Sequence, residues 1–552
     1  MRGTNRFILR YANSKYAQRL HEKINRDIVC IIPRMTYSIV WFKRDLRLHD
    51  HAALHHASAQ GPLLCLYVIE PQLWAQRDAA NQHYQFLLES LRELHQALRR
   101  FGGRLHVLTG EVPTVFAQLY AAAPFTAIYA HEETGNGFTY QRDLALGRWC
   151  RAQGVDWHEF AQFGVVRRLR DRDTWQGHWN LHMNAACLPV PELQALQFIE
   201  LPWQQARAPS AQDLGLDADE PPQRQRGGRA AGLALLESFL HERSGQYRGG
   251  ISSPLSAPTA CSRLSPYITY GCLSLREIVQ ATRLELLNMP ASAERRNKGL
   301  TAFVSRLYWH CHFIQKLESE PELEVQNVHR GYDGLREDEW NPAHFEALTS
   351  ARTGWPLVDA CVVMLRETGW LNFRMRAMLV SVAAYPLWLD WRPVGHWLAG
   401  QFLDYEPGIH WSQMQMQSGT TGINTARIYN PIKQAMDHDP HGHFVRRWLP
   451  AMRKVPDSWL FEPWRMPEDL QQRCGVIVGE DIPLPLVDLE EATKEAKARL
   501  YALRADAAVR AARGAIVDKH ASRKRPPAAI GKSQRATATT PPATSPQLTL
   551  EF

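Results

Sequence analysis

The sequence has no Cys-x-x-Cys pair, and its nine cysteines lie scattered along 552 residues. An odd cysteine count without paired spacing fits a reducing cytoplasm and argues against a disulfide framework, a zinc ribbon or a clustered iron–sulfur site. No apolar run reaches the roughly 18 residues that a membrane-spanning helix needs. We therefore expect a cytoplasmic protein with no metal site and no membrane contact.

Basic residues and tryptophan are the plentiful ones. Lys and Arg number 64 against 56 Asp and Glu, and the net charge of +8 is compatible with a polyanionic partner. The chain also has 18 tryptophans. Tryptophan can stack on aromatic ligands or relay electrons, although large helical cores would account for most of them.

Two kinds of periodicity divide the chain. Short apolar runs predict buried strands at 38–42, 63–69, 105–108, 127–130 and 156–160. Helices are expected between them at 82–101 and 139–153. This alternation predicts βα units around a parallel sheet, which binds ligands at the carboxyl ends of its strands.

The rest of the chain follows a different pattern. We expect a Rossmann-like α/β domain at 35–165, a Pro- and Gly-rich connector at 166–229 and an all-α domain at 230–500. Residues 1–34 precede Met35, which we interpret as the true start, with a targeting peptide as the alternative. The composition of residues 501–552 predicts a disordered basic tail.

The first chemical motif is Trp-Phe-Lys-Arg-Asp-Leu-Arg-Leu-His-Asp at 41–50, directly after the first strand. Charges at such a place can neutralise one another and cap the next helix. The string also closely resembles the opening signature of the photolyase/cryptochrome family, and the resemblance extends over about residues 37 to 500. It implies an antenna-chromophore α/β domain and a helical domain that binds FAD.

A second motif suits a diphosphate. Residues 261–265 combine small side chains with an arginine at a helix start, which supplies N–H groups, hydroxyls and positive charge. An N-capped helix is the simpler alternative. In the family the matching segment grips the FAD diphosphate, usually with Thr where this chain has Cys261, so we expect one hydroxyl contact to be lost.

A third motif lies at 306–313. Helical spacing puts Arg306, Trp309, His310 and Phe313 on one face, and core packing is the alternative. The resemblance implies that Trp309 lines the lesion pocket. The family usually has Glu at the place of Arg306, an acid that hydrogen-bonds the damaged bases, and this departure favours a photoreceptor over a repair enzyme.

The longest resemblance covers 353–376 and 404–434. It implies that Trp370 and Arg376 pack against the isoalloxazine ring, with Arg376 paired to Asp404. A cation there would stabilise the reduced anion. The residues expected to bind FAD are Tyr247, Cys261, Ser262, Arg263, Leu264, Ser265, His310, Arg376, Asp404, Tyr405, Glu406 and His410. The catalytic residues expected are Arg306, Trp309 and Trp370.

The resemblance also implies an electron relay and a DNA-contacting surface. Trp391 takes the middle place of the relay, Trp340 lies near the outer one and Met414 takes the inner one, so Trp411 or Trp388 substitutes or another route is used. The residues expected to contact DNA are Trp309, Phe313, Phe373, Arg374, Arg427 and Gln434, with Phe373 where the family usually has Asn.

These features together predict a monomeric deoxyribodipyrimidine photolyase acting on UV-damaged DNA, in which reduced FAD donates an electron that splits cyclobutane dimers. A cryptochrome-type photoreceptor without repair is the main alternative, and a flavoprotein that does not bind DNA is a third. An antenna, either a folate or a deazaflavin, is expected along 131–136.

The chain ends in an apolar hexapeptide that contains Gln547, Leu548, Leu550 and Phe552. It resembles the peptides that bind the bacterial sliding clamp, and a chance ending is the alternative.

Overall fold

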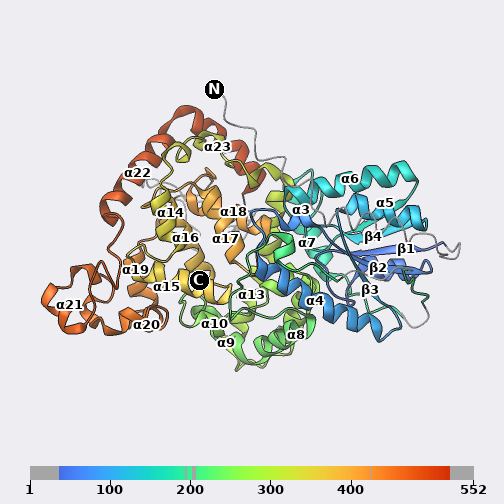
Figure 1. The fold of residues 1–552 in the computed structure, drawn as a ribbon, viewed down its shortest axis with the longest axis horizontal. Coiled ribbons are helices and arrows are strands. Elements are labelled where there is room, and N and C mark those ends of the chain that lie inside the picture. Colours follow the sequence, from blue (N-terminus) through green and yellow to red (C-terminus); the bar gives the residue numbers. More distant parts are fainter. Residues whose placement is uncertain (1–35, 193–195, 202–206, 424–425, 522–552) are drawn as a thin grey trace, which may run out of the picture.

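The computed structural model describes residues 36–192, 196–201, 207–423 and 426–521, which form an α/β part and a helical part (Figure 1). The expectations for Met35 and for Gln547–Phe552 lie outside these residues. Within them, no helix is long and apolar enough to cross a bilayer.

The α/β part is built on a five-stranded parallel sheet in the order β3-β2-β1-β4-β5. The strands are β1 (Ser38–Phe42), β2 (Leu63–Ile69), β3 (Leu105–Thr109), β4 (Ala127–His131) and β5 (Asp156–Phe160). The helices are α2 (Ala52–Ser58), α3 (Pro71–Trp74), α4 (Asn81–Arg99), α5 (Val112–Ala122) and α6 (Gly137–Gln153). The Rossmann-like parallel sheet predicted from the sequence is confirmed.

Alternate residues of β1 point to opposite faces of the sheet. Val40 and Phe42 enter a core shared with α2 and α4, whereas Ile39 and Trp41 enter a second core with α5 and α6. The first core continues into the helical part through residues such as Tyr267 and Leu307. Burial of this continuous apolar surface holds the two parts together.

The connector at 166–229 contains regular structure that the Pro- and Gly-rich composition did not predict. Helix α7 (Trp175–Asn184) buries Trp175, Trp179 and Met183, which lie one turn apart on one face. Farther on, Leu63 on β2 donates to the carbonyl of Gln197 at 3.0 Å and accepts from the amide of Ile199 at 2.8 Å. Residues 197–199 of the connector therefore pack along β2 of the sheet.

The helical part begins at Arg229, and α13 packs against α9, α12 and α18 at its centre. Its helices are α8 (Arg229–Ser238), α9 (Ser244–Gly250), α10 (Ala257–Ala260), α11 (Ser265–Thr269), α12 (Leu275–Asn288), α13 (Glu294–Ser319), α14 (Pro342–Thr349), α15 (Pro356–Thr368), α16 (Phe373–Ala384), α17 (Trp391–Gln401), α18 (Pro407–Ser418), α19 (Pro431–His438), α20 (His443–Trp448), α21 (Glu468–Cys474), α22 (Leu489–Ala505) and α23 (Ala507–His520). A π-helical turn, η4 (Phe239–Arg243), joins α8 to α9.

Order continues past residue 500, where the sequence predicted a disordered tail. The alanine-rich segment 505–515 has high helix propensity, and it forms most of α23. This helix is anchored by buried Val509 and by His520, whose Nε2 lies 2.7 Å from Glu320. The described residues of this segment, 501–521, are therefore largely helical, because local propensity and two tertiary anchors outweigh the polar composition.

Candidate functional site

The loop after β1 joins the two parts of the molecule through Arg44. Its Nε donates to the carbonyl of Thr269 at 2.9 Å, and its Nη2 lies 2.8 Å from Glu406 Oε2. Burial raises the pKa of Glu406 to about 7, while the charge of Arg44 opposes that shift. This loop therefore connects the sheet directly to the segment that carries Asp404 and Glu406.

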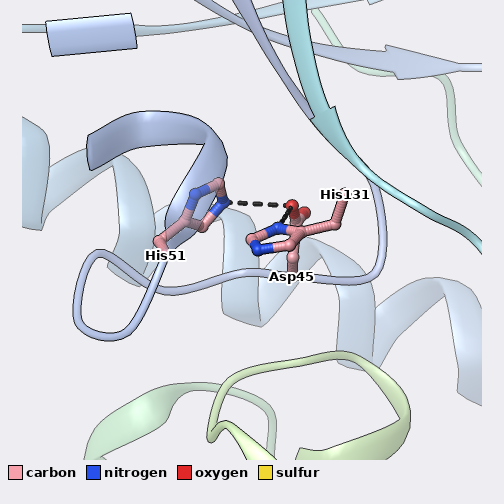
Figure 2. Close-up of side chains that lie close together, drawn as sticks. All are labelled: Asp45, His51 and His131. Atoms are coloured by element: carbon pink, nitrogen blue, oxygen red, sulfur yellow. Dashed lines mark hydrogen bonds and ion pairs between the residues drawn. The ribbon is translucent and has the colours of Figure 1, made fainter. Parts of the chain in front are cut away.

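The next residue, Asp45, turns into the α/β part and contacts two histidines (Figure 2). Its Oδ2 lies 2.8 Å from His131 Nδ1 and 3.0 Å from His51 Nε2, and all three side chains are buried. Burial opposes ionisation of Asp45, but the two histidines hold the pKa of this carboxyl well below its usual range. Burial also lowers the pKa of His131 to about 3.

The spacing of this cluster would suit a metal ion, but the hydrogen bonds do not. His51 Nδ1 caps α2 by accepting from the amide of Leu54 at 3.0 Å, so the ring carries a proton on Nε2. A metal at Nε2 would require that proton to leave and the cap to be lost. We interpret Asp45, His51 and His131 as a hydrogen-bonded cluster that holds the 43–51 loop.

Several residues expected to bind a cofactor meet at the start of α16. Arg376 pairs with Asp404, with Nη1 at 3.0 Å from Oδ1 and Nη2 at 3.1 Å from Oδ2. Burial would raise the pKa of Asp404, but the charge of Arg376 and hydrogen bonds from Arg376 and Ser265 lower it. The pairing of Arg376 with Asp404 that the sequence predicted is present.

The 261–265 segment lies beside this pair. Arg263 has a positive φ of 62° and stacks on Trp370, with its guanidinium carbon 3.9 Å from the ring centre. Burial lowers the pKa of Arg263 to about 10. Two cations, Arg263 and Arg376, thus border a partly buried site that also contains Ser265 and Trp370.

Two residues that support this segment were missed from the sequence. Arg243, at the end of the π-helical turn, donates to the carbonyls of Thr259, Cys261 and Ser262. Gln225 accepts from Arg263 at 2.9 Å through its side chain and donates back to the Arg263 carbonyl. Arg243 stands 18 residues before Cys261 and Gln225 stands 38 before Arg263, so no local spacing could have shown these contacts.

The four residues of α13 that share a helical face in the sequence have different surroundings. Trp309 and Phe313 pack together with ring centres 5.6 Å apart. Arg306 interacts with the hydroxyl of Tyr247, while His310 packs on Phe163, 5.1 Å away, and burial lowers its pKa to about 3. The face therefore separates into an aromatic surface, a cation and a buried neutral imidazole.

The residues expected to relay electrons are partly brought together. Trp391 lies 5.8 Å from Trp411, and Met414 is buried in the same core cluster. Trp340 packs instead on Phe345 at 5.1 Å. Trp388 is flanked by the guanidinium groups of Arg336 and Arg499, at 4.6 and 4.9 Å from its ring, which disfavours positive charge on it.

His410 and Tyr405 lie beside Trp411. His410 Nε2 is 2.9 Å from the carbonyl of Gly395, and burial lowers the pKa of His410 to about 4, so the ring is neutral. Its ring centre is 5.2 Å from that of Tyr405 and 4.9 Å from that of Trp411.

The residues expected to contact DNA lie on α13, α16 and α19, except Arg427, which lies in the loop before α19. Phe373 and Arg374 are the first residues of α16. Burial lowers the pKa of His438, at the end of α19, and the positive charge of nearby Arg374 lowers it further. Gln434 lies on the same α19, half-buried. The carbonyl of Arg427 accepts from Ser381 on α16 at 3.1 Å.

A cavity with about 120 Å³ of solvent-accessible space opens at the carboxyl ends of β1, β2 and β4, between the two parts. Its lining combines aromatic and charged side chains, and three of its residues, Glu133, Gly135 and Asn136, belong to the segment expected to line an antenna site. Residues of the helical part close it: Thr269, Tyr270, Tyr405 and Pro407.

Comparison with known proteins matches both parts of the chain. A family model described as the FAD binding domain of DNA photolyase matches residues 303–502, and one described as DNA photolyase matches residues 38–168. The chain is 27% identical over 479 residues to the deoxyribodipyrimidine photo-lyase of Alkalihalophilus pseudofirmus, covering 83% of this chain and 96% of that one. It is 28% identical over 479 residues to cryptochrome DASH of Gloeobacter violaceus, covering 82% and 93%.

Solved structures agree in fold. A class III photolyase from Agrobacterium tumefaciens superposes with a TM-score of 0.74 at 24% identity, over 87% of this chain and all of that one. A Synechocystis cryptochrome gives a TM-score of 0.75 at 24% identity, over 85% of this chain and all of that one.

Proposed function

Since the chain belongs to the photolyase/cryptochrome family, we propose that it is a deoxyribodipyrimidine photolyase that uses blue light to split cyclobutane pyrimidine dimers in DNA. Residues 303–502 match the family's FAD-binding domain, so FAD is the cofactor. When bound and reduced, FAD supplies the electron on absorbing light. The chain's own residues bind and orient the two partners.

The cluster around Arg376 fits FAD. The guanidinium groups of Arg263 and Arg376 offer positive charge to a diphosphate and to the polar edge of an anionic ring, and Trp370 offers an aromatic face. The ion pair with Asp404 keeps Arg376 in place. Arg243 holds the carbonyls of Thr259, Cys261 and Ser262, which fixes the backbone that leads into Arg263 and Ser265.

The main support for the proposed repair function is the packed pair of Trp309 and Phe313 on α13. Both side chains are half-buried, so they present aromatic surface without being lost in the core. A base flipped out of the duplex is held by stacking on such surfaces. Arg374 and Arg427 would hold the phosphates on either side.

Arg306 supports a second candidate, a cryptochrome-type photoreceptor. Its guanidinium interacts with Tyr247, where repair enzymes of the family usually offer a carboxylate to the damaged bases. Relatives of both kinds match this chain at similar identity.

The interdomain cavity is our proposed antenna site. It lies at the carboxyl ends of parallel strands, where such sheets bind ligands, and it is lined by aromatic residues such as Trp41 and Trp74 together with several charged groups. We therefore place the antenna in the α/β domain, residues 35–165. The folate and the deazaflavin differ in their absorption spectra, so the spectrum of the purified protein distinguishes them.

A single assay separates repair from signalling. Purified protein with reduced FAD is mixed with an oligonucleotide that carries one cyclobutane dimer and is kept in blue light or darkness. Loss of the dimer only in light supports repair, whereas dimer persistence alongside reversible FAD photochemistry supports the photoreceptor. Trp309→Leu is expected to weaken dimer binding at least about tenfold, on the scale of one base stack, and Trp448→Leu on α20 serves as the matched control.

We also propose that the protein acts as a cytoplasmic monomer and that its C-terminal hexapeptide binds the sliding clamp. The polar, basic composition of residues 522–546 would separate the hexapeptide from the helical domain and leave it accessible.

A further inference from the structure

Trp411 is connected by hydrogen bonds to a carboxylate in the other part of the molecule. Its ring is fully buried on α18, and its Nε1–H donates to the hydroxyl of Tyr405 at 3.1 Å. Because an indole N–H can only donate, the Tyr405 hydroxyl accepts here and uses its own proton elsewhere. That proton is donated to Asp78 Oδ2 at 2.6 Å.

Asp78 is well placed to receive a proton. It is 6% exposed, lies between α3 and α4 of the α/β part, and its Oδ2 also accepts from Asn136 at 3.1 Å. Burial and the neighbouring Asp78 raise the pKa of Tyr405 well above its ordinary value, so the phenol is protonated before any reaction. Tyr405 and Asp78 both line the interdomain cavity.

The other neighbour of Trp411 in the relay, Trp391, has no such base. Its Nε1 donates at 2.8 Å to Asn327, an amide oxygen that is a poor proton acceptor. The guanidinium of Arg392 lies 4.7 Å above its ring, and Asp390 and Glu337, which pair with Arg392, offset part of its charge. The remaining positive charge next to the ring disfavours loss of an electron from Trp391.

We propose that Tyr405 and Asp78 form a proton-coupled redox site that refills Trp411 with an electron during photoreduction of FAD. The inference rests on the proposed flavoprotein function. In the first step, Trp411 gives one electron to light-excited, oxidised FAD and becomes a radical cation. In the second, Tyr405 gives one electron to Trp411 while its phenol proton moves to Asp78.

After these steps Tyr405 is a neutral radical and Asp78 is a neutral carboxylic acid, and the electron that left Trp411 would reside on the bound cofactor. A thiol reductant in solution then supplies an electron to Tyr405, and the proton returns from Asp78. The electron deficiency remains on Tyr405 because its proton acceptor, Asp78, is already in hydrogen-bond contact, whereas the ring of Trp391 lies beside the guanidinium of Arg392.

The test uses the full chain with bound oxidised FAD, which is illuminated with blue light and frozen for electron paramagnetic resonance. We expect a neutral tyrosyl signal that is lost in Tyr405→Phe. Asp78→Asn should slow formation of the tyrosyl radical roughly a hundredfold, the scale that a positioned base contributes, and should prolong the tryptophan radical seen by transient absorption. Tyr332→Phe is the matched control, because that buried hydroxyl faces Arg504 rather than a carboxylate.

The outcomes separate the two proposals. If FAD is photoreduced but the tyrosyl signal is absent, or persists in Tyr405→Phe, the relay is wrong and the flavoprotein function stands. If Asp78→Asn forms the radical at the wild-type rate, Asp78 is not the acceptor and the proposed site is overturned. If well-folded protein binds no FAD, the proposed function fails, and the relay fails with it.

Discussion

Replacing Arg376 with methionine would remove the guanidinium, which holds Asp404 and lies over the ring of Phe402, while keeping an unbranched side chain of similar length. The Asp404 side chain is only 7% exposed, so its carboxylate would be left charged without a partner or would take up a proton. Either change alters the polar surface that we propose for the flavin ring.

The expected magnitude follows from burial. Breaking a fully buried pair by removing one partner costs about 3–5 kcal/mol. Because Arg376 is 23% exposed, solvent screens part of this energy, and we expect FAD binding to weaken by about 2–3 kcal/mol, or roughly 30- to 160-fold. The affinity is measured by titrating FAD into cofactor-free protein and following quenching of FAD fluorescence.

Arg392→Met is the matched control. Arg392 is 26% exposed and pairs with Asp390 at 2.9 Å, so it resembles Arg376 in burial and chemistry but lies at the start of α17. Its FAD affinity should stay within about threefold of wild type, less than one pair's screened energy. Wild-type affinity in Arg376→Met, or equal losses in both variants, would refute the role given to the pair with Asp404.

Three further predictions concern pH, salt and the chain end. Burial works against ionisation of Glu277, but Arg229 lowers the pKa of this carboxyl from 4.5 to about 2, so the free energy of unfolding should fall as pH drops from 4.5 to 2. In urea titrations, Glu277→Gln should reduce this pH-dependent fall by about 3 kcal/mol. Arg427→Ala should reduce the slope of log affinity for dimer-containing DNA against log salt by about 1, and an unchanged slope would remove Arg427 from the phosphate contacts. Deleting Gln547–Phe552 should abolish co-purification with the sliding clamp without changing FAD content; a clamp that never co-purifies with the intact chain contradicts this proposal.

The sequence predicted the sheet well because β1 to β4 are short, apolar and bounded by polar residues; β5 was also predicted to be buried, which is wrong, because it is an edge strand of mixed polarity with partly exposed side chains. Strands β1, β2 and β5 have the predicted limits, and β3 and β4 each extend one residue farther. Buried strands of this kind carry their signal locally, in each residue and its two neighbours. The same kind of signal, Trp175, Trp179 and Met183 at helical spacing, was present for α7 but was outweighed by the surrounding Pro and Gly.

The site was predictable only where resemblance or close spacing brought residues together. The pair of Arg376 and Asp404 followed from resemblance, and the structure places the two in contact. The hydrogen bond between Tyr405 and Asp78 joins residues 327 positions apart, and it exists only because the loop before α4 meets the loop before α18. No periodicity encodes such a meeting, since it depends on how two separate parts dock.

Arg44 and Asp45 are neighbours in the chain, yet their side chains serve opposite parts of the molecule. Inserting or deleting one residue between Phe42 and Arg44 would turn the carboxylate toward Glu406 and the guanidinium toward the two histidines, which would place two acids together and take from each histidine its carboxylate partner. The length of this loop should therefore be less free to vary than the identity of its exposed residues. Insertions in other surface loops would not act on this alignment directly, because the short loop between β1 and α2 sets how the α/β part and the helical part are aligned.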